Sequence, residues 1–144
     1  SWWRLVIQRF KVLKYRNLES PPRFWCGSVI IDSLWILTAA HCLFDRVQAE
    51  VYAGMIDRQA TAPYWSGMLP SANFRIHPAY SAALLDNDIA LIRVNSPISF
   101  SALVNFIPLP LRAHSTVNLA GMAATASGFG AMQAGLMRFF FKFC

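Results

Sequence analysis

The chain has 144 residues, of which 56% are hydrophobic, and its formal net charge is +6. This length and apolar content suffice for one domain with its own core and exclude an intrinsically disordered chain. No apolar run reaches the roughly 18 residues of a membrane-spanning helix, so we expect no transmembrane segment. The sequence starts at Ser1 without a charged and then apolar leader, and we expect a processed chain or a piece of a larger one.

The positive charge is concentrated at the two ends of the chain. Residues 1–23 contain six basic residues and one acidic residue, whereas residues 24–130 contain five arginines and six acidic residues. A nucleic-acid-binding domain carries its basic residues on the folded body, and no zinc-finger, RNP or helix-turn-helix signature is present. We therefore expect no nucleic-acid partner.

Residues 1–23 form a basic segment whose apolar spacing fits one face of a helix and also fits a strand, so both remain open. Residues 47–54 and 72–77 each read as a strand. His77, which precedes Pro78, is interpreted as a structural loop residue rather than a catalytic one.

The stretch at residues 24–44 concentrates the chemistry of the chain. An apolar strand-like run at residues 34–37 leads into Thr-Ala-Ala-His-Cys, which ends with His41 and Cys42, and Cys26 precedes the run. Taken alone, His41 could equally be a half-buried core histidine. A second polar group comes later, where Asp88 leads directly into the apolar sequence Ile-Ala-Leu-Ile. Asp88 is therefore expected at the boundary between a turn and the core.

These motifs resemble those of the chymotrypsin/trypsin-like serine proteases. The matching residues are Cys-Gly-Ser-Val-Ile from Cys26, Thr-Ala-Ala-His-Cys to Cys42, His-Pro-Ala-Tyr from His77, Asn-Asp-Ile-Ala-Leu around Asp88, and Ser-Gly-Phe-Gly from Ser127. The resemblance implies an all-β fold, namely the first six-stranded antiparallel β-barrel of a double barrel with only the start of the second. It divides the chain into a divergent basic segment (1–23), the first barrel (24–112), a linker and first strand of the second barrel (113–130), and a divergent apolar and basic tail (131–144).

The resemblance also assigns roles to individual residues. His41 would be the general base and Asp88 the carboxylate that orients it. Cys26 and Cys42 would form a disulfide, which implies secretion. The third cysteine, Cys144, would then pair with missing sequence or with another chain.

The family's nucleophile lies in a Gly-Asp-Ser-Gly-Gly loop that this sequence does not contain, and Ser127 does not correspond to it. The nucleophile serine is thus absent, and we expect the chain as written to be truncated and inactive. No cofactor is expected. No metal site is expected either, because His41, His77 and His114 are far apart in the sequence.

Three functions follow from these features. The first is a secreted serine endopeptidase, with protein or peptide substrates, of which this chain is an incomplete part. The second is a non-catalytic protease homologue that binds a protein partner through an exposed barrel face. The third is a peripheral membrane binder that uses the basic and aromatic ends of the chain.

Overall fold

The computed structural model describes residues 8–13, 23–54 and 64–112, together with residues 116, 118 and 120. The described part is mostly β-strand, which confirms the all-β prediction. Its strands are β1 (Gln8–Leu13), β2 (Arg23–Asp32), β3 (Trp35–Thr38), β4 (Gln48–Ala53), β5 (Trp65–Pro70), β6 (Phe74–Ile76) and β7 (Ala90–Arg93). The helical elements are α1 (Ala40–Leu43) and the 3-10 helix η1 (Ser71–Asn73).

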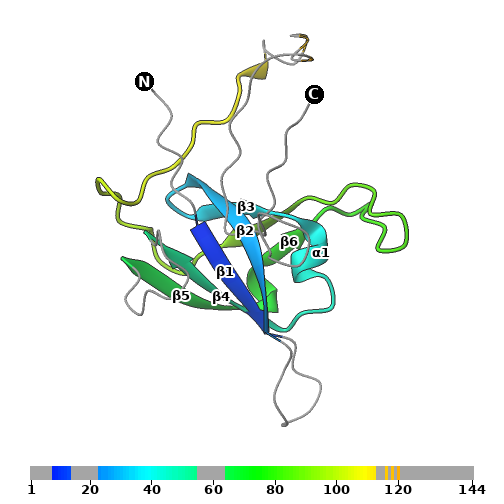
Figure 1. The fold of residues 1–144 in the computed structure, drawn as a ribbon, viewed down its shortest axis with the longest axis horizontal. Helices are drawn as coiled ribbons and strands as arrows, with labels where there is room; N and C mark the ends of the chain where they lie inside the picture. The colour runs from blue at the N-terminus through cyan, green and yellow to red at the C-terminus, as the bar shows by residue number, and fades with distance from the viewer. Residues whose placement is uncertain are drawn as a thin grey trace, which may run out of the picture. The chain divides into compact units, whose positions relative to one another are not determined.

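The strands form one antiparallel sheet in the order β5-β4-β1-β2-β3-β7-β6. Figure 1 shows β5, β4 and β1 side by side. Strand β2 joins the two halves of the sheet, because its residues up to Ser28 pair with β1 and its residues from Val29 pair with β3. The register between β2 and β3 shifts between Ile30 and Asp32, and such a bulge bends the strand that carries it. Among the described strands, β5 and β6 do not pair with each other. The sheet is therefore open and corresponds to part of a barrel.

In β3, β4 and β7 buried and partly or fully exposed residues alternate, so the core lies on one face of each of these strands. In β4, for example, Ala49, Val51 and Ala53 are buried while the residues between them are partly exposed. Burying a Val or Ile side chain stabilises the fold by about 1.5–3 kcal/mol, so this alternation fixes which face of each strand points inward. The fully buried large side chains are Ile30, Ile36, Leu43, Val51, Leu69, Ile92 and Val104.

Strand β1 resolves the ambiguity in the N-terminal segment. It pairs with β2 along its whole length, from Gln8 to Leu13, and with β4 on its other side. Two neighbouring strands satisfy the backbone hydrogen bonds of β1, and this long-range pairing decides in favour of a strand. The other residues of the segment 1–23, apart from Arg23 in β2, lie outside the described residues.

The sequence does not predict β5, and it predicts too long a strand at residues 72–77. In β5 only Leu69 is buried, so this strand shows no regular apolar alternation. It pairs with β4 alone and ends at Pro70, a position where a missing backbone N–H is tolerated. The strand at residues 72–77 is limited to Phe74–Ile76, because the residues before it form η1.

The chain divides into two units, Ser1–Ile107 and Pro108–Cys144, and all seven described strands belong to the first. In the second unit, the side chain of Asn118 accepts a hydrogen bond from the N–H of Ala120 at 3.0 Å. The expected Ser-Gly-Phe-Gly strand, the tail at residues 131–144 and Cys144 itself lie outside the described residues. Within the part of the chain that is described, no helix has the length and apolar character needed to cross a bilayer.

Candidate active site

His41 lies in α1, three residues after β3 ends. The end of β3 is tied to β2 by the Thr38 hydroxyl, which donates a hydrogen bond to the backbone oxygen of Gly27 at 3.0 Å. Ala39 is still extended, with φ −83° and ψ 145°, and α1 begins at Ala40, which is 0% exposed. A larger side chain than alanine would not fit at this buried position. The small residues therefore let the chain turn tightly while His41 itself faces solvent.

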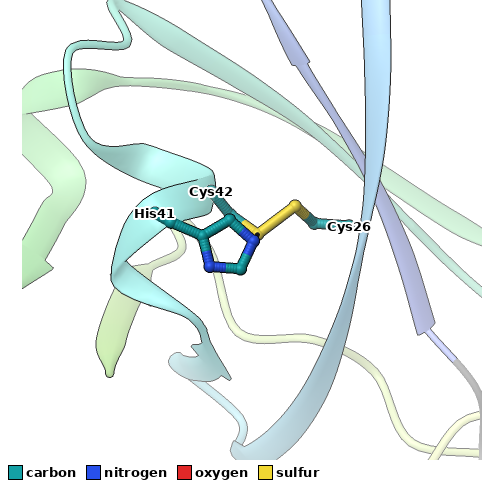
Figure 2. Close-up of side chains that lie close together, drawn as sticks. All are labelled: Cys26, His41 and Cys42. Atoms are coloured by element: carbon teal, nitrogen blue, oxygen red, sulfur yellow. Dashed lines mark hydrogen bonds between the residues drawn. A yellow bond between two sulfur atoms is a disulfide. The ribbon is translucent and has the colours of Figure 1, made fainter. Parts of the chain in front are cut away.

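A disulfide between Cys26 and Cys42 connects β2 to α1 (Figure 2). The two residues are 16 positions apart, and their Cα atoms are separated by 6.3 Å. Closing a loop of this length stabilises a fold by about 3 kcal/mol in the chain-entropy model. The bond joins the two cysteines for which the family resemblance implied a disulfide. It holds the residue next to His41 against the sheet by a covalent bond.

Asp88 lies in the connection between β6 and β7, two residues before β7. The base of this connection is closed by a hydrogen bond from the N–H of His77 to the backbone oxygen of Ile89 at 3.1 Å. Asn87 has a positive φ of 54°, and its side-chain amide donates to the backbone oxygen of Ala79 at 2.9 Å. The N–H of Ile89 donates to the backbone oxygen of Asn87 at 2.7 Å, across Asp88. The turn thus fixes the backbone on both sides of Asp88.

His41 and Asp88 meet through two hydrogen bonds. The ring Nδ1 of His41 lies 2.7 Å from Oδ2 of Asp88, and the backbone N–H of His41 donates to Oδ1 at 2.7 Å. Each carboxylate oxygen therefore contacts a different donor of the same residue, across 47 positions of sequence. This two-point contact restricts both the position and the ring orientation of His41.

A second contact connects the same two segments. The ring of Phe44, directly after α1, makes an edge-to-face contact with Tyr80, which lies between β6 and β7. The ring centroids are 5.4 Å apart and the planes are inclined by 63°. Aromatic pairs of this geometry contribute about 0.5–1.5 kcal/mol beyond their area burial. This contact helps to hold the segment that carries Asp88 next to the segment that carries His41.

The surroundings of Asp88 favour its ionised form. Burial raises the pKa of its carboxyl group. The opposing effects together are larger: they are hydrogen bonds from the backbone and ring of His41, the charge of His41, and a backbone hydrogen bond from Ala40. The net result is a pKa below the ordinary value of 3.8. Asp88 is therefore a carboxylate near neutral pH and acts only as an acceptor.

An ionised Asp88 selects one tautomer of His41, because a carboxylate accepts the proton from Nδ1. The lone pair of the neutral ring is then on Nε2. This nitrogen lies 3.4 Å from Sγ of Cys42. A disulfide sulfur has no hydrogen to donate, so the two atoms are in van der Waals contact. The His41 side chain is 52% exposed, so the imidazole ring is partly open to solvent.

The structure brings together all four site residues that the sequence singled out. Sγ of Cys26, Nε2 or Nδ1 of His41 and Sγ of Cys42 lie within 4.8 Å of one another. While the two sulfurs are bonded to each other, neither is a thiolate, and a metal ion would lack its anionic ligands. In this oxidation state the cluster is thus a disulfide beside a histidine.

Sequence reasoning missed several residues that position the pair. Thr38 and Asn87 hold the backbone on the two sides, and Phe44 and Tyr80 connect them. Asn87 was part of the motif that pointed to Asp88, and its polar side chain before a buried strand was the available signal. His77 stabilises its own turn, because its ring Nδ1 accepts a hydrogen bond from the N–H of Ala79 at 3.2 Å.

Comparison with known proteins places the chain in a family. A family model described as Trypsin matches residues 8–137. The chain is 37% identical over 107 residues to Trypsin II-P29 of Gallus gallus, covering 74% of this chain and 40% of that protein. It is 34% identical over 114 residues to Vitamin K-dependent protein C of Rattus norvegicus, covering 78% of this chain and 24% of that protein. The chain belongs to the chymotrypsin/trypsin-like family of serine proteases.

A solved structure supports the fold independently. The structure described as "Structure of GrC" superposes with a TM-score of 0.64, at 24% sequence identity, over 80% of this chain and 47% of that one. At this identity the likeness shows the fold alone. The chain spans less than half of the length of each of these three proteins, at 40%, 24% and 47%.

Proposed function

We propose that the chain is part of a serine endopeptidase in which His41 acts as the general base and Asp88 orients it. The two hydrogen bonds of 2.7 Å from His41 to the two oxygens of Asp88 are the observation that carries this proposal. A triad needs its histidine held in one tautomer, with Nε2 free to accept the proton of a nucleophile. The ionised Asp88 would also stabilise the imidazolium that forms after proton transfer. Membership of the trypsin family supports the same roles.

The 144 residues contain no Gly-Asp-Ser-Gly-Gly loop. In this proposal the nucleophile serine and the oxyanion-binding N–H groups are contributed by sequence other than these residues. These 144 residues alone would not form an acyl-enzyme, because they lack the group that attacks the peptide carbonyl. Peptide bonds of proteins or peptides are the proposed substrates of the whole enzyme.

We also propose that the protein is secreted. The disulfide between Cys26 and Cys42 supports this, since structural disulfides persist mainly in oxidising compartments. We propose a first barrel that comprises residues 24–112 together with β1 (Gln8–Leu13), which pairs with β2 and β4, and the start of a second barrel at residues 113–130. Residues 1–7, 14–22 and 131–143 have no proposed role. An intermolecular contact is proposed through Cys144 or through the exposed barrel face.

The first test is the endogenous protein itself, captured with an antibody against residues 24–44. We expect an intact mass well above 16.2 kDa and one serine labelled by a fluorophosphonate probe. An unlabelled protein with a mass of 16.2 kDa would contradict the proposal. That result would favour the second function, a non-catalytic homologue that binds a protein partner. The observation that supports this alternative is that the 144 residues contain no Gly-Asp-Ser-Gly-Gly loop.

The roles of the two residues are tested by His41→Ala and Asp88→Asn in the whole enzyme, with peptidase activity measured on protein that has not been treated with the probe. In the reference enzymes of this family, replacing the aspartate by asparagine lowers kcat by about 10⁴-fold, and we expect a similar loss for Asp88→Asn. The matched controls are His114→Ala, a histidine outside both motifs, and Asp32→Asn, whose carboxylate accepts a hydrogen bond from the N–H of Leu34. If either site variant kept its activity within a few-fold of the parent, the assigned role would be wrong.

A further inference from the structure

We propose that reduction of the disulfide converts Cys26, His41 and Cys42 into a binding site for a divalent metal ion of the Zn²⁺ class. Figure 2 shows the imidazole ring of His41 directly beside the sulfur atoms, with one ring nitrogen next to Cys42. The three candidate ligand atoms lie within 4.8 Å of one another. Two thiolates and an imidazole are ligands that Zn²⁺ binds strongly.

The spacing of the ligand atoms fits a tetrahedral site. Zn–S bonds of about 2.3 Å and Zn–N bonds of about 2.0–2.1 Å place a sulfur and a nitrogen ligand about 3.5 Å apart. Sγ of Cys42 and Nε2 of His41 are already 3.4 Å apart. After reduction, Sγ of Cys26 would only have to rotate away from Cys42 about its own side-chain bonds. The backbone of β2 and α1 would keep its present position.

The hydrogen bond on the other side of the ring is the second independent observation. A histidine that ligates a metal nearly always donates its remaining ring N–H to a carboxylate or carbonyl group, which fixes the tautomer. Nδ1 of His41 already lies 2.7 Å from Oδ2 of Asp88, so Nε2 is the nitrogen with the lone pair. The His41 side chain is 52% exposed whereas Cys42 is buried, so an ion would approach the three ligands from the side of the imidazole ring.

The chemistry of the step balances as follows. A dithiol reductant supplies two electrons and two protons, the S–S bond breaks to give two thiols, and the reductant becomes a disulfide. The metal ion then displaces one proton from each thiol and forms two metal–sulfur bonds, and Nε2 contributes the third bond without losing a proton. Both protons pass to solvent. The fourth position of the metal is left to water.

This site would act on the same atom as the proposed function. A metal bound to Nε2 occupies the lone pair that a general base needs, so metal binding and proton transfer at His41 exclude each other. Metal binding does not depend on peptidase activity, and the two proposals fail separately. A spectroscopic test of the metal site therefore requires no substrate.

The test uses the purified 144-residue chain with Cys144→Ser, which removes its third cysteine. One half of the sample is reduced with a phosphine, which takes oxygen from water and becomes a phosphine oxide. Unlike a dithiol reductant, the phosphine has no thiolate that would compete with the protein for the metal ion. Both halves are titrated with Co²⁺ and followed by absorption. We expect the reduced protein to bind one Co²⁺, with thiolate charge-transfer bands and the visible bands of a tetrahedral ion, and Zn²⁺ to displace it. The oxidised protein should show neither.

Two variants identify the ligands and their support. His41→Ala should weaken Co²⁺ binding by more than 10-fold, and Asp88→Asn should weaken it by about 10- to 100-fold, the usual effect of losing the partner of a metal-bound histidine. His114→Ala is the matched control and should leave the affinity unchanged. Unchanged affinity in His41→Ala would overturn the proposal. So would a reduced protein without the thiolate bands, or one that loses its β-sheet circular dichroism and does not regain it with Co²⁺.

Discussion

The segments that carry His41 and Asp88 are held in place by different kinds of interaction. His41 follows β3, which pairs with β2 on one side and with β7 on the other. Its neighbour Cys42 is cross-linked to β2, and both Ala40 and Leu43 are buried in the core. The His41 segment therefore combines strand pairing, apolar burial and a covalent bond.

The Asp88 segment, residues 77–89, has weaker supports: it contains no cross-linked cysteine and no fully buried residue, and it has one isolated β-bridge, between Ser81 and Asp86, and one residue packed against the core, Tyr80. It is held by turn hydrogen bonds, such as those from the N–H of Ser81 to the backbone oxygen of Asp86 and from Asn87 to Ala79. At its tip Leu84 is 72% exposed and Leu85 is 58% exposed, and Leu85 has a positive φ of 57°. A left-handed conformation costs a non-glycine residue about 1–2 kcal/mol.

This comparison shows that the geometry of the pair depends on its weaker side. Exposed turn hydrogen bonds contribute about 0.5–1.5 kcal/mol each, less than a disulfide does. Segments with little buried surface open locally at a lower free energy than the core. We therefore expect the Asp88 segment to open before the His41 segment, and each of the following predictions perturbs one side while observing both.

Removing the disulfide should have the largest effect. In the double variant Cys26→Ser and Cys42→Ser, the free energy of unfolding should fall by about 3 kcal/mol, because the unfolded chain regains the entropy of the opened loop. Urea denaturation measures this change. Amide hydrogen exchange should speed up at the N–H of Phe44, which donates to Ala40 at 2.8 Å, and stay unchanged at the N–H of His77.

The control for the disulfide prediction is Cys144→Ser, which removes a thiol that does not take part in this bridge. It should leave both the unfolding free energy and the amide exchange as in the parent. A loss of less than about 1 kcal/mol in the double variant would mean that the sheet and the buried residues of α1 hold the His41 segment without the cross-link.

Replacing Asn87 should loosen the other side. Asn87→Ala removes the 2.9 Å hydrogen bond to Ala79 and places a residue that avoids the left-handed region at a φ of 54°. The two effects together should cost about 2 kcal/mol. Asn87→Gly loses the same hydrogen bond but tolerates the positive φ, so it should cost less. Amide exchange should speed up at Ser81 and not at Phe44.

An NMR measurement on both variants distinguishes a local loosening of the turn around Asp88 from a loss of stability of the whole fold. The Nδ1–H proton of His41, held by Asp88, should broaden in Asn87→Ala and persist in Asn87→Gly. Equal losses of stability in the two variants would show that the backbone conformation at Asn87 is irrelevant and that only its side-chain hydrogen bond matters.

Sequence predicted the parts of this molecule whose signals are local. The alternation in β4 and the small residues before His41 are visible in the chain itself, and so is the carboxylate that precedes β7. The pairing of Cys26 with Cys42 and the family were accessible only through the resemblance of the motifs. Their local spacing alone left His41 open to a purely structural interpretation.

The parts that sequence did not predict depend on contacts between distant segments. Strand β5 has a single buried residue, Leu69, and becomes a strand because β4 offers it a partner. Strand β1 was ambiguous because its apolar spacing fits two periods, and pairing on both sides decides its conformation. The contact of Phe44 with Tyr80 joins two turns that no sequence pattern relates.

The smallest expected effect concerns the stability of the pair in acid. The pKa of Asp88 is lower in the folded protein than its ordinary value of 3.8. The unfolded state therefore binds the proton more readily, so Asp88 contributes stability that is fully present above pH 3.8 and is lost as the pH falls through the folded pKa. Asp88→Asn should remove this part of the acid dependence, measured by urea denaturation at pH values on both sides of 3.8. His41→Ala should remove only some of it, because this variant keeps the backbone N–H that donates to Oδ1. Equal slopes in the parent and both variants would mean that the contact between the two segments does not bias the protonation of Asp88.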